Sequence, residues 1–206
     1  MANAVQEDLN RHHAEAMRVL KAQRVELMKT KKPNDKGILI VNTGDGKGKS
    51  SSAFGVVARA VGWGMKVGVV QFIKGKWITG EKQFFQMFPD LVRFESMGEG
   101  FTWDTQDRAR DIAAAERAWA LAKELIADPD YDLVVLDELN IALRYDYLDL
   151  GAVVEELKGR PPEKHALITG RNAKPELIEI ADLVTEMTVV RHPFDNGYQA
   201  QRGIDF

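Results

Sequence analysis

The stretch Thr43-Gly-Asp-Gly-Lys-Gly-Lys-Ser50 lies between an apolar run over residues 37–42 and a helical stretch over residues 50–61. Glycines in such a loop allow backbone amides to approach phosphate oxygens, and the first amides of the following helix add the positive end of its dipole. Lys49 can reach the phosphates as a cation, and Ser50 can supply a hydroxyl ligand to Mg²⁺. Strand, glycine-rich loop and helix in this order predict a phosphate-binding loop (P-loop).

One position departs from the usual P-loop pattern, which has a glycine where this sequence has Thr43. The glycines stand instead at Gly44 and Gly46. A Gly/Lys turn that binds nothing is the alternative interpretation, but the flanking strand and helix favour a loop that binds a triphosphate. The residues predicted to contact the nucleotide here are Gly44, Asp45, Gly46, Lys47, Gly48, Lys49, Ser50 and Ser51.

Apolar runs alternate with helical stretches from residue 37 onward. Strands are predicted at 37–42, 66–72, 92–96, 133–137, 165–169 and 183–190, and helices at 50–61, 104–127, 150–158 and 175–181. Asp104 or Thr105 is the predicted N-cap of the long helix. This alternation indicates an α/β fold of the P-loop (RecA-like) kind, with a mainly parallel sheet flanked by helices. Ligands of such sheets bind at the carboxyl ends of the strands.

The run Leu133–Asp137 has the form of a Walker B strand, with four apolar residues before the carboxylates Asp137 and Glu138. A parallel sheet places these carboxylates at the same edge as the phosphate loop. The predicted Mg²⁺ ligands are therefore Ser50, Asp137 and Glu138. The alternative is that Asp137 merely caps the short helix that follows.

Composition narrows the class of protein. The chain has 206 residues, 45% of them apolar and 8% aromatic, as expected for one globular domain. It lacks cysteine, which excludes disulfides and Cys-based metal sites. No apolar run approaches the roughly 18 to 20 residues that span a bilayer, and the N-terminus lacks the apolar core of a secretory signal. We expect no membrane association and a cytoplasmic location.

Charge is distributed unevenly along the chain. The net charge is −3, yet residues 1–36 carry eight Lys or Arg against five Asp or Glu. The acidic remainder argues against nucleic acid as a partner. Residues 5–28 have loose helical spacing, and Pro33 is a plausible break. We predict an N-terminal helical arm and linker over 1–36, joined to a nucleotide-binding domain over 37–206. A solvated tail is the alternative for the arm.

Several separated motifs resemble those of the P-loop class of ATP:corrinoid adenosyltransferases. They are T-G-D-G-K-G-K-S at 43–50, A-R-A-V-G at 58–62, V-V-Q-F-I-K-G at 69–75, G-F-T-W at 100–103, V-L-D-E-L at 135–139, Y-D-Y-L at 145–148 and I-T-G-R-N at 168–172. The phosphate loop alone is common to many unrelated enzymes. Its combination with Q-F-I-K-G, G-F-T-W and T-G-R is far more specific.

The resemblance implies transfer of the 5′-deoxyadenosyl group of ATP to the Co(I) centre of a corrinoid, with release of triphosphate, in adenosylcobalamin biosynthesis. It also implies that ATP lies in reverse along the loop, with Lys49 on the triphosphate and Ser50 on Mg²⁺. Phe101 and Trp103 match the aromatic pair that displaces the lower axial ligand of cobalt. A reductant or flavoprotein that supplies Co(I), a homodimer and an N-terminal helix that closes over the corrinoid are further implications.

The chemistry needs little acid–base catalysis, because Co(I) carries no proton to remove before it attacks carbon. It needs positioning, desolvation and neutralisation of the triphosphate charge. Arg171, after the strand ending in Thr169, and Arg59, on the first helix of the domain, are further candidates for contacting the nucleotide. A simple helix-face charge is the alternative for Arg59. Trp119, at helical spacing with Ile112, is predicted to lie in the core.

Two other classes of protein use the same loop. A small-molecule kinase or ATPase needs a lid with several arginines around the γ-phosphate, which the sequence does not indicate. A nucleotide switch or nucleic-acid motor is the third possibility, and the acidic body disfavours the motor. The products distinguish the three: triphosphate for adenosyl transfer, ADP for a kinase or ATPase, and little turnover for a switch.

Overall fold

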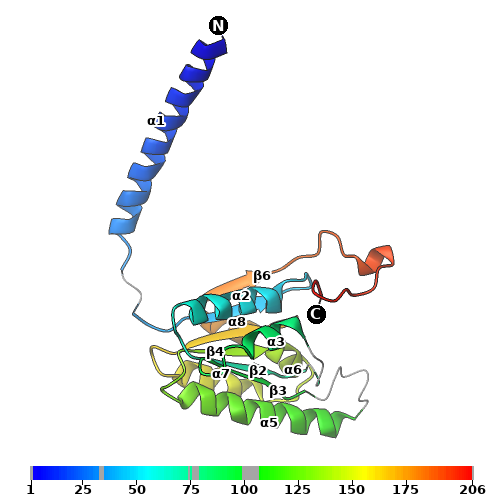
Figure 1. Cartoon of the computed structure of the whole chain (residues 1–206). Coiled ribbons are helices and arrows are strands. Elements are labelled where there is room, and N and C mark those ends of the chain that lie inside the picture. Colours follow the sequence, from blue (N-terminus) through cyan, green and yellow to red (C-terminus); the bar gives the residue numbers. More distant parts are fainter. Residues whose placement is uncertain (1, 33–34, 74, 76–78, 99–106, 206) are drawn as a thin grey trace. The chain divides into compact units, whose positions relative to one another are not determined.

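The computed structural model describes residues 2–32, 35–73, 75, 79–98 and 107–205 (Figure 1). The chain divides into two compact units, Met1–Asp35 and Lys36–Phe206. Among the positions singled out above, Phe101 and Trp103 lie outside the described residues. No helix in the described ranges is long and apolar enough to cross a membrane.

The first unit consists of the helix α1 (Ala2–Lys29), as its spacing predicted. Every described side chain from position 5 to position 32 is exposed, including apolar ones such as Leu9 and Leu20. Strong helix formers and short-range ion pairs, such as that between Lys29 and Glu26, stabilise this helix.

The second unit contains a six-stranded sheet in which all neighbouring strands are parallel, and the strand order is β3-β2-β4-β5-β1-β6. The strands are β1 (Leu39–Thr43), β2 (Val67–Gln71), β3 (Val92–Ser96), β4 (Leu133–Asp137), β5 (His165–Thr169) and β6 (Leu183–Glu186). The predicted α/β fold with a parallel sheet is confirmed. Because β1 and β4 are separated only by β5, the phosphate loop and the Walker B carboxylates emerge close together at the carboxyl edge.

Helices cover both faces of the sheet. They are α2 (Lys49–Gly62), α3 (Gly80–Phe85), α5 (Arg108–Ala127), α6 (Leu139–Arg144), α7 (Leu150–Gly159) and α8 (Pro175–Ile180), with a 3₁₀ turn at Phe194–Asn196. Residues of α2 and α3 pack into one apolar cluster, and residues of the other four α-helices pack into a second. The burial of both sheet faces explains why the central strands are continuously apolar.

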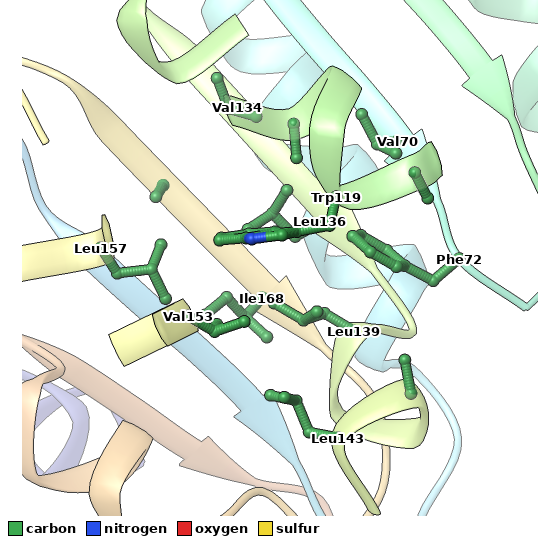
Figure 2. Close-up of a cluster of buried hydrophobic side chains, with 14 of the residues drawn as sticks. Val70, Phe72, Trp119, Val134, Leu136, Leu139, Leu143, Val153, Leu157 and Ile168 are labelled. Atoms are coloured by element: carbon green, nitrogen blue, oxygen red, sulfur yellow. The ribbon is translucent and has the colours of Figure 1, made fainter. Parts of the chain in front are cut away.

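The larger cluster is built around an indole ring. Figure 2 shows Trp119 of α5 beside Phe72 and Leu136, with Val153 and Leu157 of α7 beyond them. Trp119 is 8% exposed, which confirms its predicted place in the core. This packing makes the sheet a rigid platform for the loops at its carboxyl edge.

Most predicted boundaries differ from the structure by at most two residues, but two differ by more. The long helix begins at Arg108 rather than at residue 104, because the Asp107 carboxylate caps it by accepting a hydrogen bond from the Arg110 amide at 3.1 Å. The last strand ends at Glu186 rather than at Val190. The next residue, Met187, leaves the ladder and bonds to the phosphate loop instead.

The helix α3 was not predicted from the sequence. The six-residue α3 begins after Thr79, whose hydroxyl accepts a hydrogen bond from the Lys82 amide at 3.3 Å. Its Phe85 packs against Phe54 of α2 with ring centroids 6.0 Å apart. Tertiary packing of an aromatic residue, more than propensity, therefore holds so short a helix in place.

Candidate functional site

The phosphate loop connects β1 to α2 through two left-handed glycines. Gly44 has φ +91°, and Gly48, the N-cap residue of α2, has φ +111°. Side chains rarely tolerate this conformation, so these two positions need glycine. The loop delivers the first turn of a 14-residue helix to the carboxyl edge of the sheet, where its free amides can bind an anion.

The outer side of the loop is braced by the chain that follows β6. The Gly46 amide donates to the Met187 carbonyl at 2.7 Å, and the Met187 amide donates to the Thr43 carbonyl at 2.9 Å. A Cβ at Gly46 would lie 2.6 Å from the Thr188 carbonyl oxygen, and one at Gly44 would collide with Met187. The absence of a side chain at these two positions therefore allows the backbone of residues 187–188 to pack directly against the loop.

Thr43, the departure from the usual pattern, has a structural role of its own. Its hydroxyl accepts a hydrogen bond from the Ala173 amide at 3.0 Å, which ties the loop to the segment after β5. That segment carries Arg171, so the threonine helps to hold a second element of the site beside the loop.

Lys49 is buried at the base of the loop, with only 8% of its surface exposed. Its Nζ donates to the Gly46 carbonyl at 2.6 Å. Burial lowers the pKa of Lys49, the positive charge of Arg171 lowers it further, and the carboxylate of Glu138 acts in the opposite direction. An ammonium group beside other cations in a partly desolvated loop is well placed to gain from the arrival of a polyanion.

The Walker B strand delivers two carboxylates with different surroundings. Asp137 is fully buried and accepts hydrogen bonds from Gln71 Nε2 at 2.8 Å and from Thr169 Oγ1 at 2.7 Å. Glu138 has φ +65°, and its amide donates to the same Thr169 hydroxyl at 2.9 Å. The N-cap residue of α6 is Glu138, without a side-chain cap bond, so the alternative in which Asp137 caps the helix is wrong.

These elements surround a cleft of about 590 Å³. Its lining comprises Asp45, Gly46, Lys47, Gly48, Lys49, Ser50, Ser51, Ile73, Glu81, Glu138, Ile141, Arg144, Tyr145, Arg171, Ile204 and Asp205. All but one of the residues predicted for the phosphate loop thus line one space. They are joined there by Glu138 of the strand end and by Arg171, whose Nε lies 3.9 Å from Asp45 Oδ1.

Other predicted site residues lie away from this cleft. Arg59 is exposed on the last turn of α2. It follows Lys49 by ten residues, or about 15 Å along the helix axis. Gly44 lies behind the lining, against Met187. Asp137 is fully buried and does not line the cleft, whereas the next residue, Glu138, does.

Several lining residues were not predicted from the sequence. Tyr145 belongs to the motif Y-D-Y-L, and the Arg144 guanidinium lies 5.5 Å from its ring centroid. Asp205 forms an ion pair with Lys47, and this contact together with the Gln201 amide lowers the pKa of its carboxyl. Its place in a recognised motif is a usable signal for Tyr145, whereas nothing local marks Asp205.

The donor set of the cleft fits a hard divalent cation bound together with phosphate. Ser50 contributes a hydroxyl and Glu138 a carboxylate to the same lining, and Mg²⁺ typically takes one or two such ligands plus phosphate oxygens and water. Among the described residues no three acidic or histidine side chains are close enough to hold a metal alone.

Comparison with known proteins covers this entire site. The family model "ATP:corrinoid adenosyltransferase BtuR/CobO/CobP" matches residues 35–206. The chain is 60% identical over 173 residues to a corrinoid adenosyltransferase of Pseudomonas aeruginosa, covering 84% of this chain and 85% of that protein. It is 54% identical over 196 residues to one of a Sinorhizobium species, with coverages of 94% and 91%. A third, of Escherichia coli K12, is 47% identical over 184 residues, with coverages of 89% and 93%.

Proposed function

The chain belongs to the ATP:corrinoid adenosyltransferase family and adenosylates corrinoids with ATP as co-substrate, and on this premise we propose how its cleft carries out the transfer. The cleft beside α2 is proposed to hold the triphosphate of ATP. The observation that supports this most is the convergence of Lys49, Lys47 and Arg171 on one space at a helix N-terminus.

The transfer is a displacement at carbon. The electron pair of Co(I) forms the cobalt–carbon bond to C5′ of ATP, and the C5′–oxygen bond breaks with its pair going to triphosphate. The cobalt is thereby oxidised to Co(III), and no proton moves. Negative charge grows on the leaving triphosphate, so Lys49, Arg171 and the amides of the α2 N-terminus stabilise the transition state by neutralising it.

Mg²⁺ is proposed to bind with the triphosphate, held by Ser50 and Glu138. It would supply further charge neutralisation on the leaving group. Asp137, whose two carboxylate oxygens are bonded to Gln71 and Thr169, is proposed to act from behind rather than as a first ligand. Its burial and its two donors support that role, since a ligand of the ion would have to face the cleft.

The corrinoid side of the reaction is proposed from the resemblance. Phe101 and Trp103 would displace the lower axial ligand, and the arm carrying α1 would close over the corrinoid. A homodimer, a reductant or flavoprotein that generates Co(I), and the absence of nucleic-acid and membrane partners belong to the same proposal. We place the enzyme in the cytoplasm, because Co(I) requires a reducing compartment that also contains ATP.

The function is tested by anaerobic incubation with chemically reduced corrinoid, ATP and Mg²⁺. We expect a light-sensitive alkylcobalt spectrum and one free triphosphate per product. ADP in place of triphosphate would instead indicate phosphoryl transfer.

The role of the aromatic pair is tested with Phe101→Ala and Trp103→Ala. Both variants should lose much of the reaction that starts from Co(II) and a weak reductant, and much less when Co(I) is supplied ready-made, because the axial ligand has then already left. ATP affinity should stay near that of the wild type. Equal losses in the two assays would contradict the displacement role.

A further inference from the structure

A row of polar side chains crosses the carboxyl edge of the sheet. Ser96, Gln71, Asp137 and Thr169 are the last residues of β3, β2, β4 and β5, which are neighbours in that order. The strand register pairs Gln71 directly with Ser96 on one side and with Asp137 on the other. Four adjacent strand ends thus place four polar groups side by side at the carboxyl edge of the sheet.

The hydrogen bonds along this row all point towards one carboxylate. Lys82 Nζ of α3 donates to Ser96 Oγ at 3.1 Å, and Ser96 Oγ donates to Gln71 Oε1 at 2.8 Å. Gln71 Nε2 then donates to Asp137 Oδ2 at 2.8 Å. An ammonium group on one helix is therefore connected to a buried carboxylate through two neutral side chains, each of which accepts on one side and donates on the other.

The residue types match this task closely. Gln71 is 2% exposed and Asp137 is fully buried, so each polar atom must find its partner within the protein. A glutamine can accept a bond from a hydroxyl and donate one to a carboxylate at the same time, which a glutamate or a leucine cannot do. Bonds in such a chain polarise one another and strengthen the last one.

Each end of the row lies next to a residue that lines the cleft. At one end, Thr169 bonds Asp137 and receives the amide of Glu138, the residue that lines the cleft. At the other end, Lys82 is next to Glu81, which lines the cleft from α3. The Asp137 carboxylate is thus hydrogen-bonded to Thr169 on one side and connected through the row to α3 on the other.

We propose that Gln71 and Ser96 are positioning residues that link Lys82 to Asp137 and thereby hold the strand end that presents Glu138 to the Mg²⁺–triphosphate. This inference rests on the proposed binding of Mg²⁺ and triphosphate in the cleft. None of the four strand-end residues lines the cleft, so the loss of the row should act on how strongly the ion is bound rather than on the reacting atoms.

The test is calorimetric titration of inorganic triphosphate into Gln71→Met at a series of Mg²⁺ concentrations. Methionine keeps the length and bulk of the side chain and removes both hydrogen bonds. We expect the Mg²⁺ concentration for half-maximal triphosphate binding to rise about tenfold, the effect of losing one hydrogen bond to a charged group. Ser96→Ala and Lys82→Met, both at partly buried positions, should shift it in the same direction by less.

Two further results complete the test. The double variant Gln71→Met/Ser96→Ala should behave like Gln71→Met alone, because the second change removes a link that is already broken. Thr185→Val is the matched control. Thr185 faces Asn42 in the β1–β6 register and makes no side-chain hydrogen bond with other described residues, so it should bind Mg²⁺–triphosphate as the wild type does.

An unchanged Mg²⁺ requirement in Gln71→Met and Ser96→Ala would overturn the proposal, as would additive effects in the double variant. Melting temperatures of all variants identify any variant that fails to fold. If Gln71→Met does not fold, the Mg²⁺ requirements of Ser96→Ala and Lys82→Met test the proposal instead. Adenosylation of reduced corrinoid at saturating Mg²⁺ separates the two proposals. A wild type that binds no triphosphate refutes the proposed function of the cleft, whereas an active wild type with unaltered variants refutes the row alone.

Discussion

Two buried lysines at opposite edges of the sheet look alike by most measures. Lys49 at the carboxyl edge is 8% exposed, and Lys164, just before β5 at the amino edge, is 2% exposed. Burial lowers the pKa of both ammonium groups. Both donate to backbone carbonyls: Lys49 to Gly46, and Lys164 to Asp128 at 2.6 Å and to Tyr131.

The difference lies in what each ammonium group can still bind. Lys164 bonds two carbonyls beside a hollow of about 130 Å³, whereas Lys49 bonds one carbonyl and lines a cleft of about 590 Å³. The chain before β5 is also held by Arg160, which donates to the Lys164 and Gly37 carbonyls. Burial and a shifted pKa therefore do not identify a functional lysine. What distinguishes Lys49 is an ammonium group that lines a cleft and can donate further hydrogen bonds there.

The sharpest contrast is expected from Lys49→Ala. Triphosphate affinity should fall by more than about a hundredfold, because a charge-assisted contact to phosphate is lost, while the apo protein stays folded. Wild type with ATP at 100 times its dissociation constant should gain about 2.7 kcal/mol of unfolding free energy, and the variant almost none. Thermal melts with and without ATP measure this. Equal shifts in the two proteins would remove Lys49 from the site.

Lys164→Met should show the opposite pattern. The free energy of unfolding should fall by about 2 to 4 kcal/mol, because the Asp128 and Tyr131 carbonyls lose their buried donor. Chemical denaturation measures the loss. The gain on adding ATP should remain that of the wild type, and a loss of ATP binding below the melting range would mean that the two edges are not independent.

The pH dependence of stability provides a second view of Lys164. Its folded pKa lies below the ordinary 10.5, so between these two values the unfolded chain binds more protons than the folded protein. This group therefore makes the free energy of unfolding rise with pH in that window and contributes no slope below it. The stability gap between wild type and Lys164→Met should widen as the pH is raised towards 10.5. A gap that narrows would contradict the lowered pKa.

At the amino edge of the sheet, Asp182 makes the stability of the protein depend on pH in the acidic range. Its carboxylate accepts a hydrogen bond from the Leu39 amide at 2.9 Å and pairs with Lys36, and these contacts lower its pKa below 3.8. Its stabilisation is present above pH 3.8 and is lost as the pH falls through the folded pKa. Asp182→Asn should cost about 1 to 2 kcal/mol at neutral pH and little in strong acid. A cost that is independent of pH would point to packing instead.

The smallest effect is expected at the carboxyl edge, from Asp205→Asn. Removing a carboxylate that pairs with Lys47 should tighten triphosphate binding about two- to fivefold at low salt, since like charges no longer compete for the same cation. The gain should vanish at high salt. Calorimetric titration of triphosphate at two ionic strengths measures this effect. Weaker binding by Asp205→Asn would mean that the Asp205 carboxylate helps to bind triphosphate rather than competing with it for Lys47.

Sequence patterns predicted those strand ends and loops that are determined by residues close together in the chain. The boundaries of β3, β4 and β5 match the prediction, and in β4 and β5 the reason is an apolar run that ends in a polar residue. The phosphate loop and Glu138 could be predicted for the same reason, since strand ends of a parallel sheet share an edge.

Other features depend on contacts that no local window contains. The end of β6 is decided by the bonds of Met187 to a loop far away in the chain. The role of Gln71 becomes visible only when the strand order sets it between Ser96 and Asp137. Asp205 pairs with Lys47, although almost the whole sequence of the domain separates the two residues. A six-residue helix such as α3 has too short a pattern to be recognised.

The bracing of the phosphate loop has a consequence for the speed of association. Because the Gly46 amide and the Thr43 carbonyl are bonded to Met187, the protein's own backbone holds the curvature of the loop. The observed rate of triphosphate association should then rise linearly with concentration, without the plateau that a slow rearrangement imposes. The Gly46 amide is also engaged outward, so a phosphate would be bound by the amides that follow it, at the start of α2.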